Sequence, residues 1–558
     1  METTVVHRAC PAGQALAAAL TRPEAYGDGA APVELRETHI SWVFLVGDRA
    51  YKLKKPVTLP FVDYGTVERR RAMCEEEVRL NRRLAPDIYL GTRAVVPTAD
   101  GVTLAPTGAP DAIDHVVEMR RFDEARTLGA RVTHGGEYYP ALVAVGRRLA
   151  AFHAEADAPA GNHATAALHA AFAENFDTLL AQSPDHEFAG RVAALARFTE
   201  AFFTSRRSEL EARAAAGRVR DGHGDLRAEH VLLAHGVEVV DCLEFDPALR
   251  IVDVGCDLAF LLMDLEALGS PAAARAVLDG YRRAGGDPGD DALLAFFSVY
   301  RALVRAKVAL VRAGQSPDRP RLVAYAHARI GLAEHFAWRS RQPGLIIFAG
   351  LSATGKTRLA SALSTRSGLR HLNSDPVRKR LLGLAPAARA GAAAYGESFN
   401  RRTYTELGRL ARQELEHGRG VLVDATFRRA ADRGSFLDAL GGLPEASLVV
   451  ECRAPAGVRL ERARRRSGEA SAVSDADAEV VRLQREDAGL LDELPPARHI
   501  TVRTDRPPAE VLDDLAALLD ARLARSVVRR SGAAGSCGLP VRRPGVASAS
   551  QLREKGPS

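Results

Sequence analysis

Residues 345–357 read LIIFAGLSATGKT, a short apolar run followed by a glycine-rich turn. The second part, 350–357, matches the pattern G-x-x-x-x-G-K-[ST] in full, and the helical pattern RLASALS follows at 358–364. Backbone N–H groups of such a loop wrap phosphate oxygens, the lysine neutralises the β and γ phosphates, and the final hydroxyl reaches Mg²⁺. The segment therefore predicts a site for ATP and Mg²⁺. The expected binding residues are Gly350, Ser352, Thr354, Gly355, Lys356 and Thr357, with Thr357 on the metal.

The chain beyond this loop alternates between apolar strand candidates and helical segments. Such alternation predicts right-handed βαβ units on a parallel sheet, in an α/β domain that we place at 344–525. The pattern resets at Gln342-Pro343-Gly344, which marks the preceding boundary. The further strand candidates are RHLNSD (370–375), GVLVDAT (420–426), SLVVECRA (447–454) and HITVRTD (499–505).

Charged residues follow several of these strands. Asp375 comes just past the second strand, and Arg378 lies one turn into the next helix. Asp424 ends the third, where a carboxylate can contact Mg²⁺ directly or through water. The segment ERARRRSGEASAVSDAD (461–477) has the composition of an arginine-bearing lid that closes on phosphate charge. A solvated basic helix face is the alternative interpretation.

In size and motif order this half resembles the small P-loop kinases of the gluconate kinase, nucleoside-monophosphate kinase and zeta-toxin kind. The resemblance implies that Asp375 and Arg378 contact the acceptor substrate, with Asp375 and Lys356 taking part in catalysis. It also implies that lid arginines bind the nucleotide, and Arg462 and Arg466 share a helix face at i,i+4 spacing.

A second phosphotransfer motif stands at 222–233, GHGDLRAEHVLL. Kinase catalytic loops read H-x-D, with an Asn five residues after the Asp that holds a metal ion. Here the aspartate is Asp225, and the fifth position is His230. The stretch is therefore a variant of the motif or a relic of it.

Two upstream segments supply the other parts of such a site. YKLKKPV (51–57) reads as a strand, on which Lys52 and Lys54 share one face. We favour Lys54 as the phosphate ligand, with Lys52 as the alternative. Glu77, in the helical segment 73–84, could form the ion pair that positions this lysine.

Downstream, Asp241 ends an apolar strand candidate sixteen residues after Asp225, and Asp257 leads an apolar helix. This series resembles the aminoglycoside phosphotransferase family, within the protein-kinase-like α+β fold, and we place that domain at 1–340. Tandem chains of this kind resemble a group of bacterial predicted bifunctional kinases. The resemblance implies transfer of the ATP γ-phosphoryl group to a hydroxyl. Asp225 would accept the hydroxyl proton, Asp241 would hold Mg²⁺, and Lys54 would steady the phosphates.

His230 is the main departure from the family pattern, because imidazole is a poor Mg²⁺ ligand beside oxygen donors. Glu244, three residues after Asp241, could supply the missing oxygen. The base, the lysine, the helix glutamate and the metal aspartate all remain, so we favour a competent variant. His153 is expected to be structural, and His223 to brace the loop by hydrogen bonding.

Composition limits the remaining possibilities. The 558 residues, 46% hydrophobic and 26% charged, describe a multidomain globular protein. The net charge of +6 comes mostly from a tail at 526–558, which holds six basic residues and one acid and is expected to be disordered. The rest is nearly neutral, so nucleic-acid binding is not indicated. Six cysteines lack CxxC spacing, and no uncharged apolar run reaches roughly 18 residues. The first twenty residues do not show a basic segment followed by a long apolar run, so we expect no signal peptide. We expect a cytoplasmic protein with no membrane contact and infer no obligate protein partner.

Three functions fit these observations. The favoured hypothesis is a bifunctional kinase with two ATP sites, each phosphorylating a hydroxyl of a small, sugar-like or otherwise polar metabolite. The second is an ATP-hydrolysing regulatory switch, in which a pseudokinase-like first half binds a ligand. The third is a polynucleotide-end kinase that uses the P-loop half and the basic tail.

Overall fold

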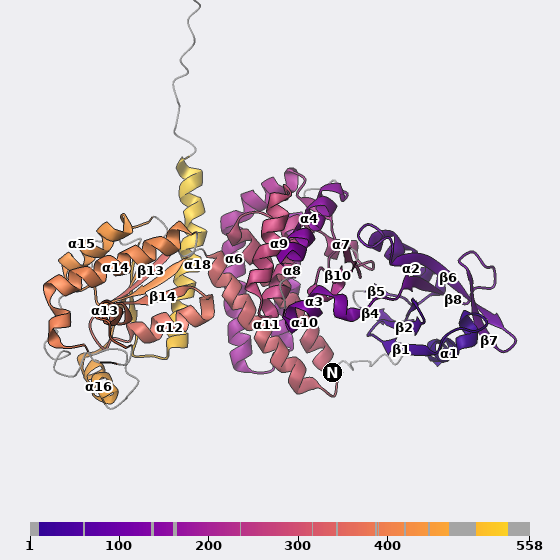
Figure 1. Ribbon diagram of the computed structural model, residues 1–558, viewed down its shortest axis with the longest axis horizontal. Helices are drawn as coiled ribbons and strands as arrows, with labels where there is room; N and C mark the ends of the chain where they lie inside the picture. The colour runs from indigo at the N-terminus through magenta and orange to yellow at the C-terminus, as the bar shows by residue number, and fades with distance from the viewer. Residues whose placement is uncertain are drawn as a thin grey trace, which may run out of the picture.

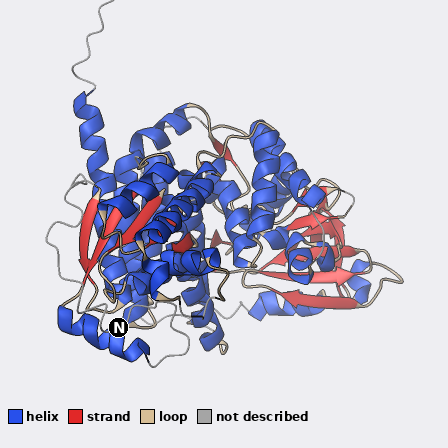
Figure 2. Cartoon of the chain, turned by 60° about the vertical axis from the view of Figure 1, so that its left-hand side comes forward, coloured by secondary structure: helices blue, strands red, loops and turns tan. Residues whose placement is uncertain are grey.

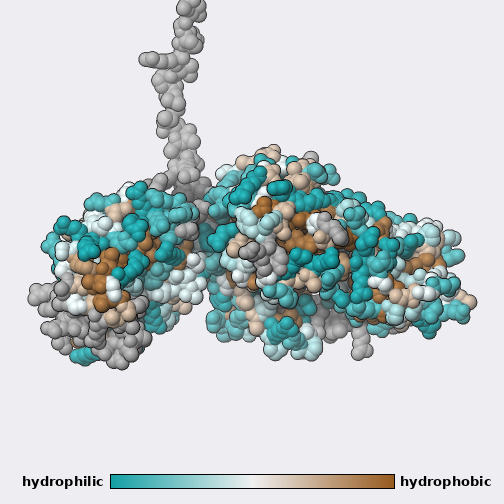
Figure 3. Space-filling view, in the orientation of Figure 1, coloured by the Kyte–Doolittle hydropathy of each residue, from teal (hydrophilic) through white to brown (hydrophobic). Residues whose placement is uncertain are grey.

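The computed structural model describes most of residues 11–533. Its internal gaps are 60–61, 136–138, 160–163, 235, 315, 342–343, 386–387, 389, 418–419, 445–446 and 468–497. Figure 1 shows three bodies in a row: a β-rich lobe, a helical lobe and an α/β domain. On the face drawn in Figure 3, hydrophilic side chains predominate and hydrophobic ones form scattered patches. Within the described residues, no helix has the length and apolar character needed to cross a bilayer.

The β-rich lobe is built on an antiparallel six-stranded sheet with the order β1-β2-β3-β8-β6-β7. The β2–β3 hairpin turns at Gly47-Asp48, and Val46 pairs with Arg49. Cys74 and Val78 of helix α2 pack on one face of this sheet. Leu20, which follows α1, packs on the other face. The bounds are α1 Pro11–Ala19, η1 Pro23–Tyr26, β1 Val33–Glu37, β2 Ser41–Val46, β3 Arg49–Lys54, β4 Thr58–Leu59, β5 Val62–Asp63, α2 Val67–Asn81, β6 Tyr89–Thr98, β7 Gly101–Pro106 and β8 Asp114–Arg120.

The helical lobe, which Figure 2 shows as mostly helix, encloses a large apolar core. It also holds two short strand pairs, and Figure 1 places β10 of one pair on the side that faces the β-rich lobe. Two lobes of this composition are the protein-kinase-like arrangement that the sequence predicts. The bounds are η2 Glu124–Arg126, α3 Leu128–His134, α4 Tyr139–Glu155, α5 Ala164–Ala181, α6 His186–Ala215, β9 Val219–Asp221, η3 Ala228–His230, β10 Val231–Leu233, β11 Val237–Val239, α7 Pro247–Arg250, β12 Ile251–Asp253, α8 Val254–Ala267, α9 Pro271–Arg283, α10 Asp291–Ala313 and α11 Arg319–Ser340.

The α/β domain has a parallel five-stranded sheet with the order β14-β15-β13-β16-β17, which confirms the predicted strands. Alternate residues of β13 face opposite layers: Ile347 packs toward α14, and Ile346 toward α12 and α18. The bounds are β13 Leu345–Ala349, α12 Lys356–Ser367, β14 Arg370–Asn373, α13 Ser374–Leu381, η4 Ala392–Tyr395, α14 Glu397–Glu416, β15 Val421–Asp424, α15 Ala430–Leu440, β16 Ser447–Arg453, α16 Ala456–Ser467, β17 His499–Arg503 and α18 Pro508–Ala533.

The α/β domain packs against the helical lobe through α18, which lies beside α6 (Figure 1). Arg341 makes a bidentate, buried ion pair with Asp520 of α18, at 2.7 and 2.8 Å. Trp338, from the end of α11, enters the apolar layer formed by α12 and α18. The two halves of the chain therefore share a packed boundary.

The predicted start of a disordered tail at 526 differs from the structure. Helix α18 continues to Ala533, so residues 526–533 of the predicted tail are helical. The remainder of the predicted tail, 534–558, lies outside the described residues.

Candidate active sites

The glycine-rich loop joins β13 to α12 as predicted. Gly350 has φ +135°, and a Cβ there would lie 2.4 Å from the Cys452 carbonyl oxygen, so only glycine fits. Gly355 has φ +91° and precedes α12 without a side-chain cap, which leaves the first N–H groups of the helix to an oxyanion. Lys356 Nζ donates to the Leu351 carbonyl at 2.9 Å and so lies over the loop. The loop fits a polyphosphate.

The predicted metal ligands of this loop lie close together. Asn373 Nδ2 donates to Thr357 Oγ1 at 3.2 Å and to Asp424 Oδ2 at 2.7 Å. The register makes this possible, because Asn373 pairs with Asp424 across β14 and β15. His371, on the same face of β14, lies 3.5 Å from Asp424. A hydroxyl and a carboxylate are hard oxygen donors of the type Mg²⁺ prefers, so these residues fit that ion.

Asn373 and His371 were not among the predicted site residues. The signal was in the strand candidate 370–375, where side chains two apart share a face. Which of its residues meets Asp424 depends on the strand register, and register is set by pairings distant in the sequence.

The predicted acceptor residues Asp375 and Arg378 both lie in α13. The Asn373 side chain caps this helix by accepting from the Asp375 N–H at 2.8 Å. Arg378 is buried and donates to the Ala394 carbonyl at 2.9 Å and to Asn400 Oδ1 at 2.8 Å. These bonds tie α13 to η4 and α14, so Arg378 has a structural role whether or not it meets a substrate.

Of the two predicted lid arginines, the structure describes the side chain of Arg462 but not that of Arg466. Arg462 Nη1 donates to the Thr354 carbonyl at 3.4 Å, which places this guanidinium against the glycine-rich loop. Burial and the neighbouring charge of Arg358 lower the pKa of Arg462. Arg466 is in the last turn of α16, where side chains are not described, and 468–497 lies outside the described residues.

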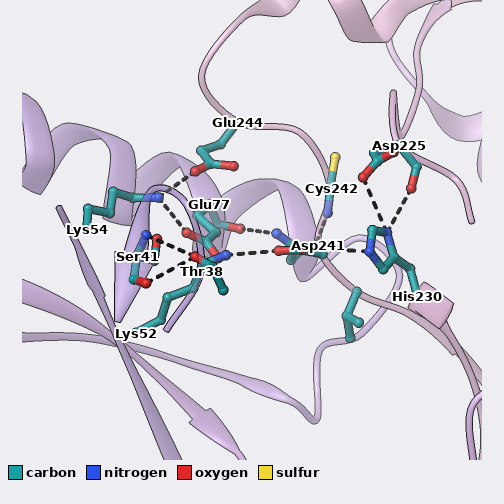
Figure 4. Close-up of polar contacts among 12 residues, drawn as sticks. Thr38, Ser41, Lys52, Lys54, Glu77, Asp225, His230, Asp241, Cys242 and Glu244 are labelled. Carbon is teal, nitrogen blue, oxygen red and sulfur yellow. Dashed lines mark hydrogen bonds and ion pairs between the residues drawn. The ribbon is translucent and has the colours of Figure 1, made fainter. Parts of the chain in front are cut away.

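Lys52 and Lys54 share one face of β3 and both reach Glu77 (Figure 4). Lys52 Nζ lies 2.8 Å from Glu77 and 2.9 Å from Asp241. Lys54 Nζ lies 2.7 Å from Glu77 and also pairs with Glu244, and its side chain is 0% exposed. Burial acts to lower the pKa of both lysines, but the paired carboxylates outweigh it and hold each pKa well above the usual value.

Burial distinguishes Lys54, the predicted phosphate ligand, from Lys52, the predicted alternative. Lys52 is partly exposed beside Asp241, whose side chain is half exposed, whereas Glu244 and Tyr64 enclose the buried Lys54. Two residues along the strand take the ammonium group from a partly exposed position to a fully buried one. The alternation of side chains along a strand does not predict this difference. Lys52 is therefore the better candidate for binding phosphate.

Asp241 is held in an unusual backbone conformation, with φ +64°. Its N–H donates to the Tyr89 hydroxyl at 3.1 Å, and the next N–H donates to Asn81 Oδ1 at 2.9 Å. A non-glycine residue at positive φ is strained, and such strain is concentrated at functional sites. The charge of Lys52 lowers the pKa of Asp241 far below its usual range, so this carboxylate is ionised.

His230 lies between Asp225, the predicted base, and Asp241, the predicted metal ligand (Figure 4). Its Nδ1 is 3.8 Å from Asp225 Oδ2, and its Nε2 is 3.7 Å from Asp241 Oδ2. Nδ1 donates to the Asp225 carbonyl at 2.8 Å, and Nε2 accepts from Arg227 at 2.8 Å. Burial and the charge of Arg227 lower the pKa of His230, which favours the neutral ring.

The predicted alternative metal ligand, Glu244, does not lie with these groups. Its carboxylate accepts from Lys54 and from the Tyr64 hydroxyl at 2.8 Å, so it balances the buried lysine. Among the described residues, no three His, Cys, Asp or Glu side chains are grouped to hold a metal unaided. Asp241 is a hard oxygen donor that fits Mg²⁺ carried by nucleotide phosphates.

Buried residues behind the loop fix its shape. The Asp257 carboxylate accepts from the N–H groups of His223 and Gly224 at 2.7 and 2.9 Å. His153 lies 3.1 Å from Asp257, and His223 Nε2 contacts the Val240 carbonyl at 3.0 Å. Both histidines are buried and structural, as predicted.

Comparison with known proteins covers both halves. A family model described as "AAA domain" matches residues 345–491. Uncharacterized protein Rv2004c of Mycobacterium tuberculosis and Uncharacterized protein Mb2027c of Mycobacterium bovis are each 31% identical over 456 residues, which cover 80% of this chain and 88% of the relative.

Solved structures match each half separately. A gluconokinase from Sinorhizobium meliloti 1021 is 20% identical, with a TM-score of 0.24, over 34% of this chain and 98% of that one. A choline/ethanolamine kinase family protein from Mesorhizobium loti is 17% identical, with a TM-score of 0.37, over 58% of this chain and 93% of that one.

Proposed function

The chain belongs to the same family as these two mycobacterial proteins, and we propose that it is a bifunctional ATP-dependent phosphotransferase. Each half would transfer the γ-phosphoryl group of ATP to a hydroxyl of a small polar metabolite. The observation that carries the proposal is the line of groups from Lys52 through Asp241 and His230 to Asp225 (Figure 4). A phosphate-binding cation, a metal carboxylate and a proton acceptor are the parts that phosphoryl transfer requires.

In the first half, Asp225 would orient the acceptor hydroxyl and take its proton as the oxygen attacks phosphorus. Its pKa is lowered, because Arg227 and His230 outweigh the effect of burial. Lys52 would hold phosphate oxygens while Glu77 fixes the lysine. Mg²⁺, when bound, would neutralise phosphate charge beside Asp241.

In the second half, the N–H groups of the glycine-rich loop and Lys356 would hold the phosphates, and Arg462 would add positive charge from α16. Thr357 and Asp424 would hold the metal, with Asn373 fixing both side chains. Asp375 begins α13 next to this group and is the proposed contact for the acceptor.

Two single variants test the two sites separately. Purified protein with Mg²⁺-ATP and a panel of hydroxyl metabolites should yield phosphorylated products that mass spectrometry identifies. Asp225→Asn should remove one set of products and Lys356→Ala the other. If neither variant reduces any transfer, the proposal is wrong.

The neutral ring of His230, where kinases have an oxygen donor, favours one alternative: an ATP-hydrolysing switch whose first half only binds a ligand. Product analysis separates the two functions. Free phosphate as the sole product, whatever metabolite is added, would support the switch.

A further inference from the structure

Two arginines of helix α10, Arg301 and Arg305, lie one helical turn apart, and Arg301 contacts the catalytic loop. Arg301 Nη1 donates to the Gly224 carbonyl at 3.1 Å, directly before Asp225 in the chain. Arg305 lies one turn further along the same helix face, about 6 Å on at 1.5 Å per residue. Burial acts to raise the pKa of Asp225, but nearby cations, first Arg227 and also Arg305, outweigh it. Arg305 therefore lies one helical turn from a residue that contacts the catalytic loop, and its charge acts on the proposed base.

Arg305 forms a cationic cluster with two residues of α11. The Tyr325 hydroxyl accepts from Arg305 Nε at 3.3 Å and from Nη2 at 3.2 Å. Arg329 stacks on the Tyr325 ring, with its Cζ 4.4 Å from the centroid, while the Cζ of Arg305 is 5.9 Å away. We call Arg305, Tyr325 and Arg329 the arginine–tyrosine cluster.

The arginine–tyrosine cluster has hydrogen-bond donors that no described group accepts. Arg329 Nε is buried without a hydrogen-bond partner. Across the part of the chain that the structure describes, no carboxylate lies within ion-pair distance of Arg305 or Arg329, whereas Arg191, Arg213, Arg250 and Arg339 of this lobe each have one. Because Tyr325 accepts from Arg305, its own hydroxyl hydrogen remains to be donated. Two partly buried cations on one ring, without a counter-ion, are unfavourable unless an anion joins them.

Two carboxylates of α8 are bonded to the catalytic loop. Asp264 accepts from the Ala228 N–H at 3.0 Å, and the loop N–H groups occupy Asp257. Further along α10, burial and the charges of Lys55 and then Arg312 lower the pKa of His39, in the turn before β2. Arg312, near the end of α10, therefore lies close enough to the β-rich lobe for its charge to act on His39.

We propose that the arginine–tyrosine cluster is the acceptor subsite of the first active site and that it binds an oxyanion group, carboxylate or phosphate, of a hydroxyl-bearing substrate. The inference rests on the proposed function and narrows its substrate class. The hydroxyl oxygen bonds to the γ-phosphorus of ATP, the bond to the ADP oxygen breaks, and the proton passes to Asp225. The oxyanion group stays unchanged and holds the hydroxyl in place. Cationic acceptors would be repelled.

A matched set of acceptors tests this in the full chain carrying Lys356→Ala, which silences the second site. The probes are glycerol, glycerate, glycerol 3-phosphate and choline, with transfer measured from γ-labelled ATP. Glycerate or glycerol 3-phosphate should have the highest kcat/KM, and the better of the two tells carboxylate from phosphate. Preference for choline or glycerol would overturn the inference while leaving the proposed phosphotransferase intact.

Variants locate the effect. Arg305→Gln and Arg329→Gln should each raise KM for the anionic acceptor about tenfold or more, since each removes a charge-assisted contact, with KM for ATP unchanged. The matched control is Arg321→Gln, an exposed arginine of the same helix α11. Calorimetric titration of glycerate and of glycerol 3-phosphate provides a readout independent of turnover. Binding that is absent, or equal in the double variant and the parent, would refute the subsite. Loss of all transfer on Asp225→Asn, with anion binding retained, would support both claims.

Discussion

Lys52 and Lys54 leave the same face of β3 and meet different surroundings. Lys52 is partly exposed beside Asp241, and Lys54 is buried in a group with Glu77, Glu244 and Tyr64. Removing a buried ammonium that lies between two carboxylates lowers the stability of the fold, because the carboxylates stay buried without a compensating charge. The two lysines should therefore differ in what they support: ligand binding for one and folding for the other.

Substituting each lysine by methionine, which keeps the apolar stem, tests this difference. Lys52→Met should raise KM for ATP at the first site about tenfold or more, by loss of a charged phosphate contact. Lys54→Met should lower the free energy of unfolding by about 3–5 kcal/mol, because Glu244 stays buried without its cation. Denaturant unfolding and ATP titrations in the Lys356→Ala background measure both. The assignment fails if Lys54→Met abolishes ATP binding at unchanged stability.

His230 gives the first site a predictable pH response. Burial and Arg227 lower its pKa from the usual 6.5, so the ring is neutral at pH 7 and gains a proton only on acidification. An imidazolium 3.7 Å from Asp241 would compete with Mg²⁺ for that carboxylate. First-site turnover should therefore fall below pH 6.5 and need more Mg²⁺ there. His230→Asn should remove this acidic decline; a decline of the same midpoint in the variant would assign it to another group.

At the scale of elements, Asn373 at the end of β14 both caps a helix and orients residues of the second site. Asn373 caps α13 through its oxygen and bonds Thr357 and Asp424 through its nitrogen. Both functions depend on parallel pairing with β15, which sets Asn373 opposite Asp424. One amide thus orients a helix, a hydroxyl and a carboxylate.

Asn373→Ala should weaken both the cap of α13 and the metal site formed by Thr357 and Asp424. Loss of the cap should cost about 1 kcal/mol of unfolding free energy. Loss of the two amide bonds should raise the Mg²⁺ concentration for half-maximal second-site turnover, because Thr357 and Asp424 are no longer held together. Thr365→Ala, on the exposed face of α12, is the control. An unchanged Mg²⁺ requirement in Asn373→Ala would remove this residue from the metal site.

The sequence predicts elements whose signals are local. The β13–loop–α12 unit, the strands of the parallel sheet and the hairpin at Gly47-Asp48 are such cases, because turn chemistry and side-chain periodicity lie within a few residues. Contacts set by packing between distant segments are not local. The roles of Lys52 and Lys54 depend on Glu244, 190 residues from Lys54, and the arginine–tyrosine cluster needs the packing of α10 on α11.

At the scale of the whole molecule, the question is whether the two halves unfold as one unit. Helix α18 completes one face of the parallel sheet and also packs against α6 of the helical lobe. Arg341 lies over the rings of Phe198 and Trp338, at 4.6 and 4.8 Å, and forms its ion pair with Asp520 at this boundary. Because side chains from both halves surround this pair, its energy couples them.

Breaking the pair should separate the two transitions. The parent chain should unfold in a single thermal transition, whereas Arg341→Met or Asp520→Asn should give two, since each leaves a buried charge without its partner, at about 3 kcal/mol. In a double-mutant cycle the combined variant should be less destabilised than the sum of the single variants. Arg339→Met, which breaks the more exposed pair with Glu266 within the helical lobe, is the control and should keep one transition. Calorimetry distinguishes the outcomes: two transitions in the parent, or one in every variant, would show that the halves are not coupled through this pair.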